Sequence, residues 1–126
     1  MEIPRDMLLP ILKCKVNVIF KLYTGRRELC GERLLTVGRK SYAVADIYST
    51  KLTTLDKLSE KDVKMGGFNS ILDFESWWFQ NGYREYNTIY VIRFNILKFK
   101  PIGRWYLKKL NIPVPIIKEE LGDYDE

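Results

Sequence analysis

The passage over residues 52–68 constrains the fold of this chain more than any other, because it carries both a start and a stop signal for a helix. A leucine-rich strand end leads into Ser59, and Asp62 follows three residues later. The serine oxygen can accept a hydrogen bond from an unpaired backbone N–H, and the acid lies near the positive end of the helix. Gly66-Gly67 then ends the helix, and Ser70-x-x-Asp73 starts a second one. The passage therefore predicts a strand followed by two short helices, each capped by a serine.

Strand and helix signals continue on both sides of this passage. Toward the N-terminus, residues 7–12 predict an edge strand, because Pro10 cannot donate a hydrogen bond inside a sheet. Residues 16–23 predict a helix, because apolar side chains recur there at i, i+3, i+4 and i+7 and Gly25 follows. Alternation and β-branched residues predict further strands over 34–37, 42–49 and 89–96. Residues 38–40 predict a turn, and beyond the last strand the only helix candidate is 103–110.

Strands interleaved with short helices indicate a small α+β domain built around a curved or closed β-sheet. At 126 residues the chain is long enough for one core. We expect residues 1–100 to form that domain and residues 101–126 to form a C-terminal extension with an acidic tail. Consecutive aromatics at 77–79 could stack on bases, but packing is the commoner role of such a run, and we interpret them in that way.

Composition excludes several kinds of site. The chain has no histidine, and Cys14 and Cys30 have no CxxC spacing, so it cannot build a zinc site or a thiol–histidine pair alone. We expect two reduced, partly buried thiols and no metal or other cofactor. No apolar run approaches the roughly 20 residues that span a bilayer. The short apolar run near the N-terminus lacks a cleavage site, so we expect a cytoplasmic protein that does not bind a membrane.

Charge is unevenly distributed along the chain. Residues 119–126 hold five acids and no base, and the rest of the chain keeps 21 bases against 11 acids, a net charge of +10. Eight bases lie between residues 13 and 40, and seven bases with no acid lie between residues 93 and 118. The body is therefore basic enough to attract a polyanion, and the tail opposes that attraction or recruits a protein partner.

The serine-capped helix start followed by Gly-Gly-Phe-Asn-Ser resembles a passage of the ASCH family (activating signal cointegrator homology). The Asp-rich start and the Gly-Phe-x-Ser order look most like archaeal members. ASCH domains are small relatives of the RNA-modifying PUA barrels. The resemblance covers residues 7–97 and implies a small PUA-like β-barrel with short helices packed at its side.

The resemblance also implies a cleft motif. In ASCH proteins the first helix is followed by a motif resembling Gly-x-Lys-x-x-Thr-x-Arg, which lines the cleft between barrel and helices. The matching segment here is residues 25–33, in which Gly25 matches and Arg27 keeps the charge of the lysine. Cys30 stands where the threonine would be, and Arg33 falls one residue beyond the expected arginine.

Some bacterial members are amidohydrolases that act on acylated cytidine, through a lysine, a threonine nucleophile and a glutamate just before the second helix. These roles would fall on Arg27, Cys30 and Gly66. Arginine is too basic to act as a general base, and Gly66 offers no carboxylate. A Cys30 thiolate would lack a partner to handle its proton. We therefore expect no catalysis by this mechanism.

Without catalytic partners, this part of the chain still offers basic side chains close to tyrosines. Such side chains suit phosphate binding and base stacking. The planar guanidinium of arginine binds phosphate oxygens in pairs, and its face stacks on bases. The predicted RNA-binding residues are Lys21, Tyr23, Arg26, Arg27, Arg33, Arg39, Lys40 and Tyr42.

These observations favour a module that binds RNA or a nucleotide-containing ligand in a basic cleft without catalysis. Two alternatives stay open. One is a hydrolase, either a nucleoside amidohydrolase or a ribonuclease, with a rearranged active site. The other is a protein-interaction adaptor that works through the acidic tail.

Overall fold

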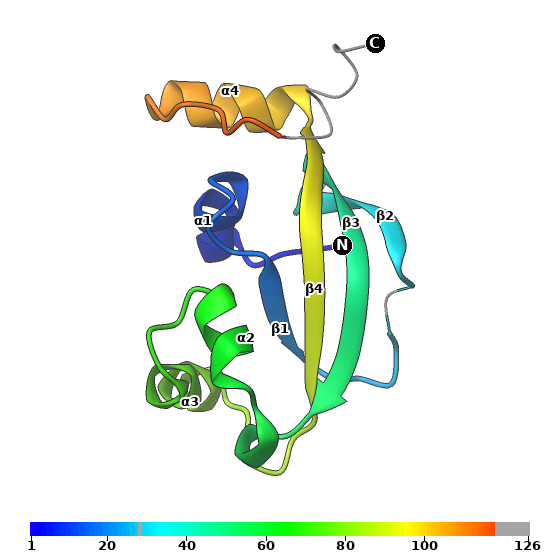
Figure 1. Cartoon of the computed structure of the whole chain (residues 1–126), viewed down its shortest axis with the longest axis vertical. Coiled ribbons are helices and arrows are strands. Elements are labelled where there is room, and N and C mark those ends of the chain that lie inside the picture. Colours follow the sequence, from blue (N-terminus) through cyan, green and yellow to red (C-terminus); the bar gives the residue numbers. More distant parts are fainter. Residues whose placement is uncertain (28, 118–126) are drawn as a thin grey trace.

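A curled antiparallel sheet of four strands forms the centre of the domain, in the order β1-β4-β3-β2 (Figure 1). The computed structural model describes residues 1–27 and 29–117. The strands are β1 (Val18–Leu22), β2 (Gly31–Val37), β3 (Lys40–Thr53) and β4 (Ile89–Phe99). Because β3 and β4 are long and curved, the sheet forms a half-barrel, which confirms the predicted α+β class.

Short helices pack beside this half-barrel. They are η1 (Arg5–Met7), α1 (Leu8–Leu12), η2 (Leu55–Lys57), α2 (Glu60–Met65), α3 (Ile71–Gln80) and α4 (Pro101–Lys109). Figure 1 shows α2 and α3 near the end at which β4 begins, and α4 across the end at which β4 stops. No helix in the described part of the chain is long and apolar enough to cross a membrane.

β4 is buried on both faces, which explains its nearly continuous apolar sequence. Ile92 and Phe94 lie in a core that also contains residues of α1 and α4, whereas Ile89 and Val91 lie in a second core under α2 and α3. The aromatic run at 77–79 belongs mainly to this second core. There the buried Trp78 ring packs on other aromatics, and its Nε1 donates a hydrogen bond to the carbonyl of residue 84 at 3.0 Å.

The N-terminal segment extends the sheet beyond β2. The amide of Ile3 donates to the carbonyl of Thr36 at 2.9 Å, and the amide of Thr36 donates to the carbonyl of Met1 at 2.9 Å. This short pairing covers part of the β2 edge, which would otherwise present unpaired backbone groups.

The predicted helix starts are confirmed. The Oγ of Ser59 accepts a hydrogen bond from the amide of Asp62 at 3.3 Å, and the Oγ of Ser70 accepts one from the amide of Asp73 at 3.1 Å. The strands predicted at 34–37, 42–49 and 89–96 lie within β2, β3 and β4. The last helix is also present, as α4.

Two predicted elements are wrong, and they exchange types. Residues 16–23 contain strand β1 rather than a helix, and residues 7–12 contain α1 rather than a strand. In β1, Val18 and Phe20 face the second core while Ile19 faces the first, so burial on both faces produces spacings that mimic a helical stripe. Pro10 lies in the first turn of α1, where the missing N–H costs no helical hydrogen bond.

The segment after residue 100 packs on the sheet. Leu107 of α4 and Ile117 are buried in the same core as α1 and β4. The boundary between a domain of residues 1–100 and an extension of residues 101–126 stays a prediction. The acidic tail, residues 119–126, lies outside the described part of the chain.

Candidate nucleic-acid interface

A basic cleft of about 290 Å³ opens between η1 and α1, the β2–β3 turn and α4. Its charged and aromatic lining residues are Arg5, Arg39, Lys40, Tyr42 and Tyr106. Leu8, Val37 and Gly38 complete the described lining, so no acid is among the described residues that line this cleft. Three of the eight predicted RNA-binding residues therefore lie together here.

The β2–β3 hairpin places two of these cations at its tip. Gly38 has a φ of +62°, a conformation that favours glycine, and the chain reverses there so that Val37 pairs with Lys40. Glu2 supports the turn, because its carboxylate accepts hydrogen bonds from the Gly38 amide at 2.6 Å and the Thr36 hydroxyl at 2.7 Å. The hydrogen bonds from Thr36 and Gly38 hold the pKa of Glu2 below its usual value.

The aromatic wall of the cleft joins α4 to the start of β3. The rings of Tyr42 and Tyr106 meet edge to face, with their centroids 6.0 Å apart. The amide of Lys100 donates to the carbonyl of Tyr42 at 3.0 Å, and Gly103 is buried against that same carbonyl. Because backbone contacts hold α4 in place, the tyrosines keep a fixed position beside the cations.

The other predicted residues do not line this cleft. Lys21 lines a separate hollow of about 380 Å³ with residues of α3 and its C-terminal loop. The Tyr23 ring stacks on Tyr90, with their centroids 6.3 Å apart. Arg26 is exposed on the β1–β2 connection.

Arg27 and Arg33 have partners of their own. The guanidinium of Arg27 donates hydrogen bonds to the carbonyl and the hydroxyl of Thr50, at 2.9 and 3.1 Å. Arg27 is therefore bound to strand β3. The guanidinium of Arg33 donates to the carbonyl of Glu32 at 2.7 Å.

Sequence reasoning missed Arg5 and Tyr106 as members of the cleft. Arg5 precedes a segment that we expected to be an edge strand, and Tyr106 lies beyond the predicted domain boundary. The absence of acids from residues 93–117 was the available signal for α4, but it does not show which side chain faces the cleft.

The matched motif segment, residues 25–33, is also placed differently from the expectation. The first α-helix is α1, and a strand follows it, so the segment forms the β1–β2 connection and the start of β2. Gly66, where the resemblance would need a carboxylate, is buried against Phe20. A Cβ at Gly66 would lie 2.5 Å from the ring, so that position has no room for a side chain unless the core shifts.

A buried carboxylate lies elsewhere, at Asp62 in α2, which is only 1% exposed. Nε and Nη2 of Arg93 donate hydrogen bonds to Oδ1 and Oδ2 of Asp62, at 2.9 and 2.6 Å. Nζ of Lys51 lies 2.9 Å from the same Oδ2 of Asp62. Nη1 of Arg93 also donates to the hydroxyl of Ser49 at 3.1 Å. We call these four residues the Asp62 cluster.

Burial by itself raises the pKa of Asp62, but the hydrogen bonds from Arg93 and Lys51 outweigh it and hold this pKa below the usual value for aspartate. Asp62 therefore stays ionised at neutral pH. Sequence reasoning saw it only as the acid of a helix cap. Its partners lie on β3 and β4, and no local pattern identifies them.

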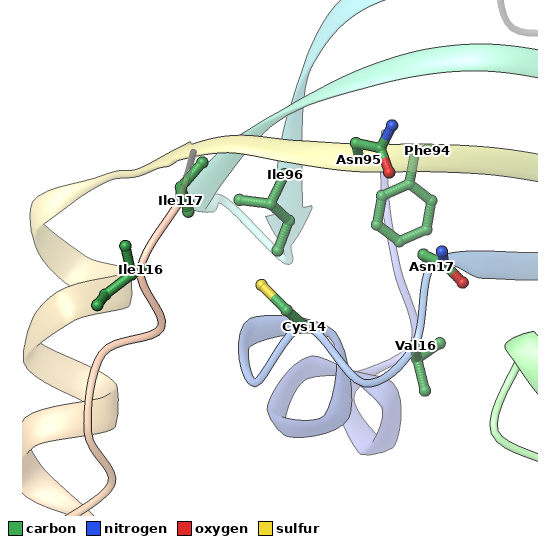
Figure 2. Close-up of a pocket in the computed structure, with 8 residues that line it drawn as sticks. All are labelled: Cys14, Val16, Asn17, Phe94, Asn95, Ile96, Ile116 and Ile117. Atoms are coloured by element: carbon green, nitrogen blue, oxygen red, sulfur yellow. The ribbon is translucent and has the colours of Figure 1, made fainter. Parts of the chain in front are cut away.

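A third hollow, of about 350 Å³, lies between the end of α1, β4 and the C-terminal segment (Figure 2). Asn17 and Asn95 line it together with Cys14, Ile96 and the segment at 116–117. We expected partly buried thiols, but Cys14 and Cys30 are both exposed when the accessible surface of the whole residue is counted. The Cys14 thiol itself points into this hollow, and its partial burial raises the pKa of Cys14. The raised pKa favours the protonated, unreactive form of this thiol.

Comparison with known proteins shows likeness at the level of structure. No protein-family model matches this chain, and no curated protein matches it. A protein of Enterococcus faecalis V583, described by the family model DUF984, aligns with a TM-score of 0.60 at 8% identity, over 76% of this chain and 72% of that one. A mutant of ZmASCH from Zymomonas mobilis aligns with a TM-score of 0.57 at 12% identity, over 98% of this chain and 91% of that one.

The ASCH domain from Lactobacillus crispatus JV V101 aligns with a TM-score of 0.52 at 15% identity, over 74% of this chain and 71% of that one. These three structures come from bacteria, so the resemblance to archaeal members is not confirmed. The half-barrel and its flanking helices agree with the fold that the sequence resemblance implied. This chain therefore has the fold of ASCH-domain proteins.

Proposed function

We propose that this chain is an RNA-binding module with the ASCH fold, which holds RNA or a nucleotide-containing ligand in the basic cleft without catalysis of its own. The observation that carries the proposal is the composition of the cleft. Three cations, Arg5, Arg39 and Lys40, line it together with two tyrosines, and no acid is among its described lining residues. As part of the proposal, we expect the protein to meet its ligand in the cytoplasm.

The cations and the tyrosines of the cleft supply the two contacts that single-stranded RNA needs, which are phosphate binding and base stacking. Guanidinium and ammonium groups bind phosphate oxygens through charge-assisted hydrogen bonds. Tyrosine rings offer faces or edges on which bases stack without strong sequence preference. The volume of the basic cleft is close to that of one nucleotide. This volume lies at the lower limit of the usual range for ligand-binding sites.

The non-catalytic part of the proposal rests on the residues to which the resemblance assigned catalysis. Gly66 is packed against Phe20, and Arg27 binds Thr50 through its guanidinium. Neither arrangement supplies a base or a carboxylate to Cys30. The Asp62 carboxylate is already bound by Arg93 and Lys51, so it is a poor acceptor for a proton from a nucleophile.

Fluorescence anisotropy with a short labelled single-stranded RNA tests the cleft. We expect Arg39→Ala combined with Lys40→Ala to weaken binding by about a hundredfold or more, because each charge-assisted hydrogen bond contributes on the order of 1.5–3 kcal/mol and about 1.4 kcal/mol is tenfold. The log–log salt slope should also become shallower by roughly 0.7 for each phosphate that the double variant no longer binds. Unlabelled mononucleotide added as a competitor shows whether a nucleotide alone occupies the cleft.

Lys57→Ala combined with Lys61→Ala is the matched control, since it removes the same charge from exposed lysines outside the cleft lining. We expect this control to weaken binding only slightly. Equal losses in the two double variants would show that net charge, rather than the cleft, attracts RNA. Wild-type protein that does not bind RNA at low salt would overturn the proposal.

The same RNA, analysed for cleavage after incubation, addresses the hydrolase alternative. We expect the RNA to stay intact and acetylated cytidine to release no acetate. Turnover that disappears in Cys30→Ser would favour the hydrolase.

A further inference from the structure

Trp105 on α4 is a large aromatic side chain that the packing of the domain leaves exposed. It is 57% exposed, whereas Trp78 is fully buried. Indole rings carry a large apolar surface that packing normally removes from water, and tryptophan is enriched at interfaces, where its apolar body is covered and its N–H finds a partner.

The geometry of α4 directs this ring away from the domain. Gly103 and Leu107 are buried, so they mark the inner side of the helix. With 3.6 residues per turn, positions 105, 108 and 109 fall on the outer side. Nζ of Lys109 lies over the Trp105 ring, 4.9 Å from its centroid, and Lys108 is exposed on the same side.

The charged residues that flank Trp105 in the sequence are all bases. Residues 93–117 contain no Asp or Glu. A cation already lies over one face of the ring, and the opposite face is the surface onto which a flat group could stack. Exposed indole flanked by lysines is complementary to a ligand that combines flat rings with negative charge.

Along α4, Trp105 lies one residue from the basic cleft. Tyr106, the residue next to Trp105, lines that cleft with Tyr42. Close packing of Gly103 on the Tyr42 carbonyl fixes the distance between the two surfaces. Because neighbouring helical residues point about 100° apart, a strand that leaves the cleft beside Tyr106 would pass partly around α4 to reach Trp105.

We propose that Trp105 is a stacking platform for one base of a single-stranded RNA that extends out of the basic cleft, and that Lys108 and Lys109 bind the phosphates on either side of that base. This inference rests on the proposed function, because it assigns the path of the same ligand. If the inference is correct, α4 is part of the RNA-binding surface.

The alternative occupant is an anionic membrane surface, which also binds basic helices that carry tryptophan. α4 has nine residues, and its exposed large apolar side chains are Trp105 and Ile102. This apolar surface is small compared with the faces that interfacial helices bury, so the structure favours RNA.

Tryptophan emission and anisotropy measured with one labelled RNA test the proposal. We expect the RNA to quench the emission of the wild-type protein and Trp105→Phe to abolish most of the quenching. Trp105→Ala should weaken binding by about tenfold, the loss typical of one base stack, and Trp105→Phe should restore part of the affinity. Phe79→Ala is the matched control, because it removes a 45% exposed aromatic from α3 and should leave affinity unchanged.

An RNA with one abasic site at each position in turn completes the design. At one position the missing base should weaken binding to the wild type but not to Trp105→Ala. If the wild type binds RNA and the cleft variant weakens binding, but Trp105→Ala binds as the wild type does, the platform is wrong and the proposed function stands. If the wild type does not bind RNA, both fail. Binding to anionic vesicles that depends on Trp105 more strongly than RNA binding does would assign α4 to a membrane surface instead.

Discussion

At the scale of single residues, Asp62 shows how a charge is kept inside this domain. It is the buried charged side chain of the described residues, and its two oxygens bind Arg93 and Lys51. A carboxylate removed from water is costly unless partners replace the lost hydration, and two cations do so here. The Asp62 cluster thereby joins α2 to β3 and β4, since each strand supplies one of the cations.

Replacing this carboxylate should destabilise the fold. We expect Asp62→Asn to lower the free energy of unfolding at neutral pH by about 3 kcal/mol, because two partly buried cations lose their counter-ion. Urea denaturation measures the change. Asp73→Asn is the matched control, since Asp73 occupies the same position in its capped helix but is exposed, and it should cost less than about 1 kcal/mol. Similar losses in the two variants would mean that the helix cap, not the cluster, matters.

The difference in stability between the wild type and Asp62→Asn should change with pH in a defined direction. Asp62 has a lowered pKa in the folded protein, so its contribution is complete above the ordinary aspartate pKa of 3.8 and is lost as pH falls through the lower, folded pKa. The stability gap between wild type and Asp62→Asn should therefore stay constant from neutral pH down to about pH 5 and narrow below about pH 4. A gap that narrows already between pH 8 and pH 6 would contradict this assignment.

At the scale of elements, α4 is positioned by backbone contact rather than by side chains alone. Gly103 lies so close to the carbonyl of Tyr42 that a Cβ at this position would overlap the carbonyl oxygen. That carbonyl already accepts a hydrogen bond from Lys100, so it cannot turn away without losing the bond. Both the cleft and the proposed Trp105 platform depend on this contact, because they share α4.

Gly103→Ala tests the anchoring of α4. In an unconstrained helix the change would stabilise the protein, because alanine exceeds glycine in helix propensity by roughly 1 kcal/mol. We expect the opposite sign here, a loss of about 1–3 kcal/mol typical of overpacking, together with weaker RNA binding. Thermal unfolding followed by circular dichroism decides the sign. A raised melting temperature would show that α4 can move away from β3 at little cost.

At the scale of the whole molecule, charge is separated along the chain. A basic body of net charge +10 precedes a tail in which residues 119–126 hold five acids. These acids lie outside the described residues. A tethered anionic segment competes with phosphate for a basic surface at high effective concentration.

Deletion of residues 119–126 should therefore tighten RNA binding at low salt. The gain should shrink as salt approaches 1 M, where the screening length is about 3 Å. Anisotropy titrations over a salt series measure both effects. A full-length variant in which the five acids become amides separates charge from length and should behave like the deletion. Unchanged affinity in both variants would favour a tail that recognises a protein partner.

The sequence by itself determined those parts of the protein that depend on neighbours along the chain. The serines that cap α2 and α3 bind amides three residues away, and the hairpin at Gly38 reverses the chain within two residues. The strand β4 was predicted because residues 89–96 are rich in β-branched and aromatic side chains. The likeness to ASCH proteins rested on the same local signals, and structural comparison confirmed the fold.

Only the tertiary structure decided the type of β1, the partners of Asp62 and the lining of the cleft. A strand with two buried faces lacks the period of two that distinguishes it from a helix, so residues 16–23 were ambiguous by pattern. Asp62 meets Arg93, 31 residues away, because α2 packs against β4 in the second core. The pairing of β3 with β4 places Ser49 opposite Arg93. Arg5 and Tyr106 join the cleft because α1 and α4 fold back against the β2–β3 hairpin. Such contacts depend on strand register and helix docking, which are set by the burial of the whole core and leave no local trace in the sequence.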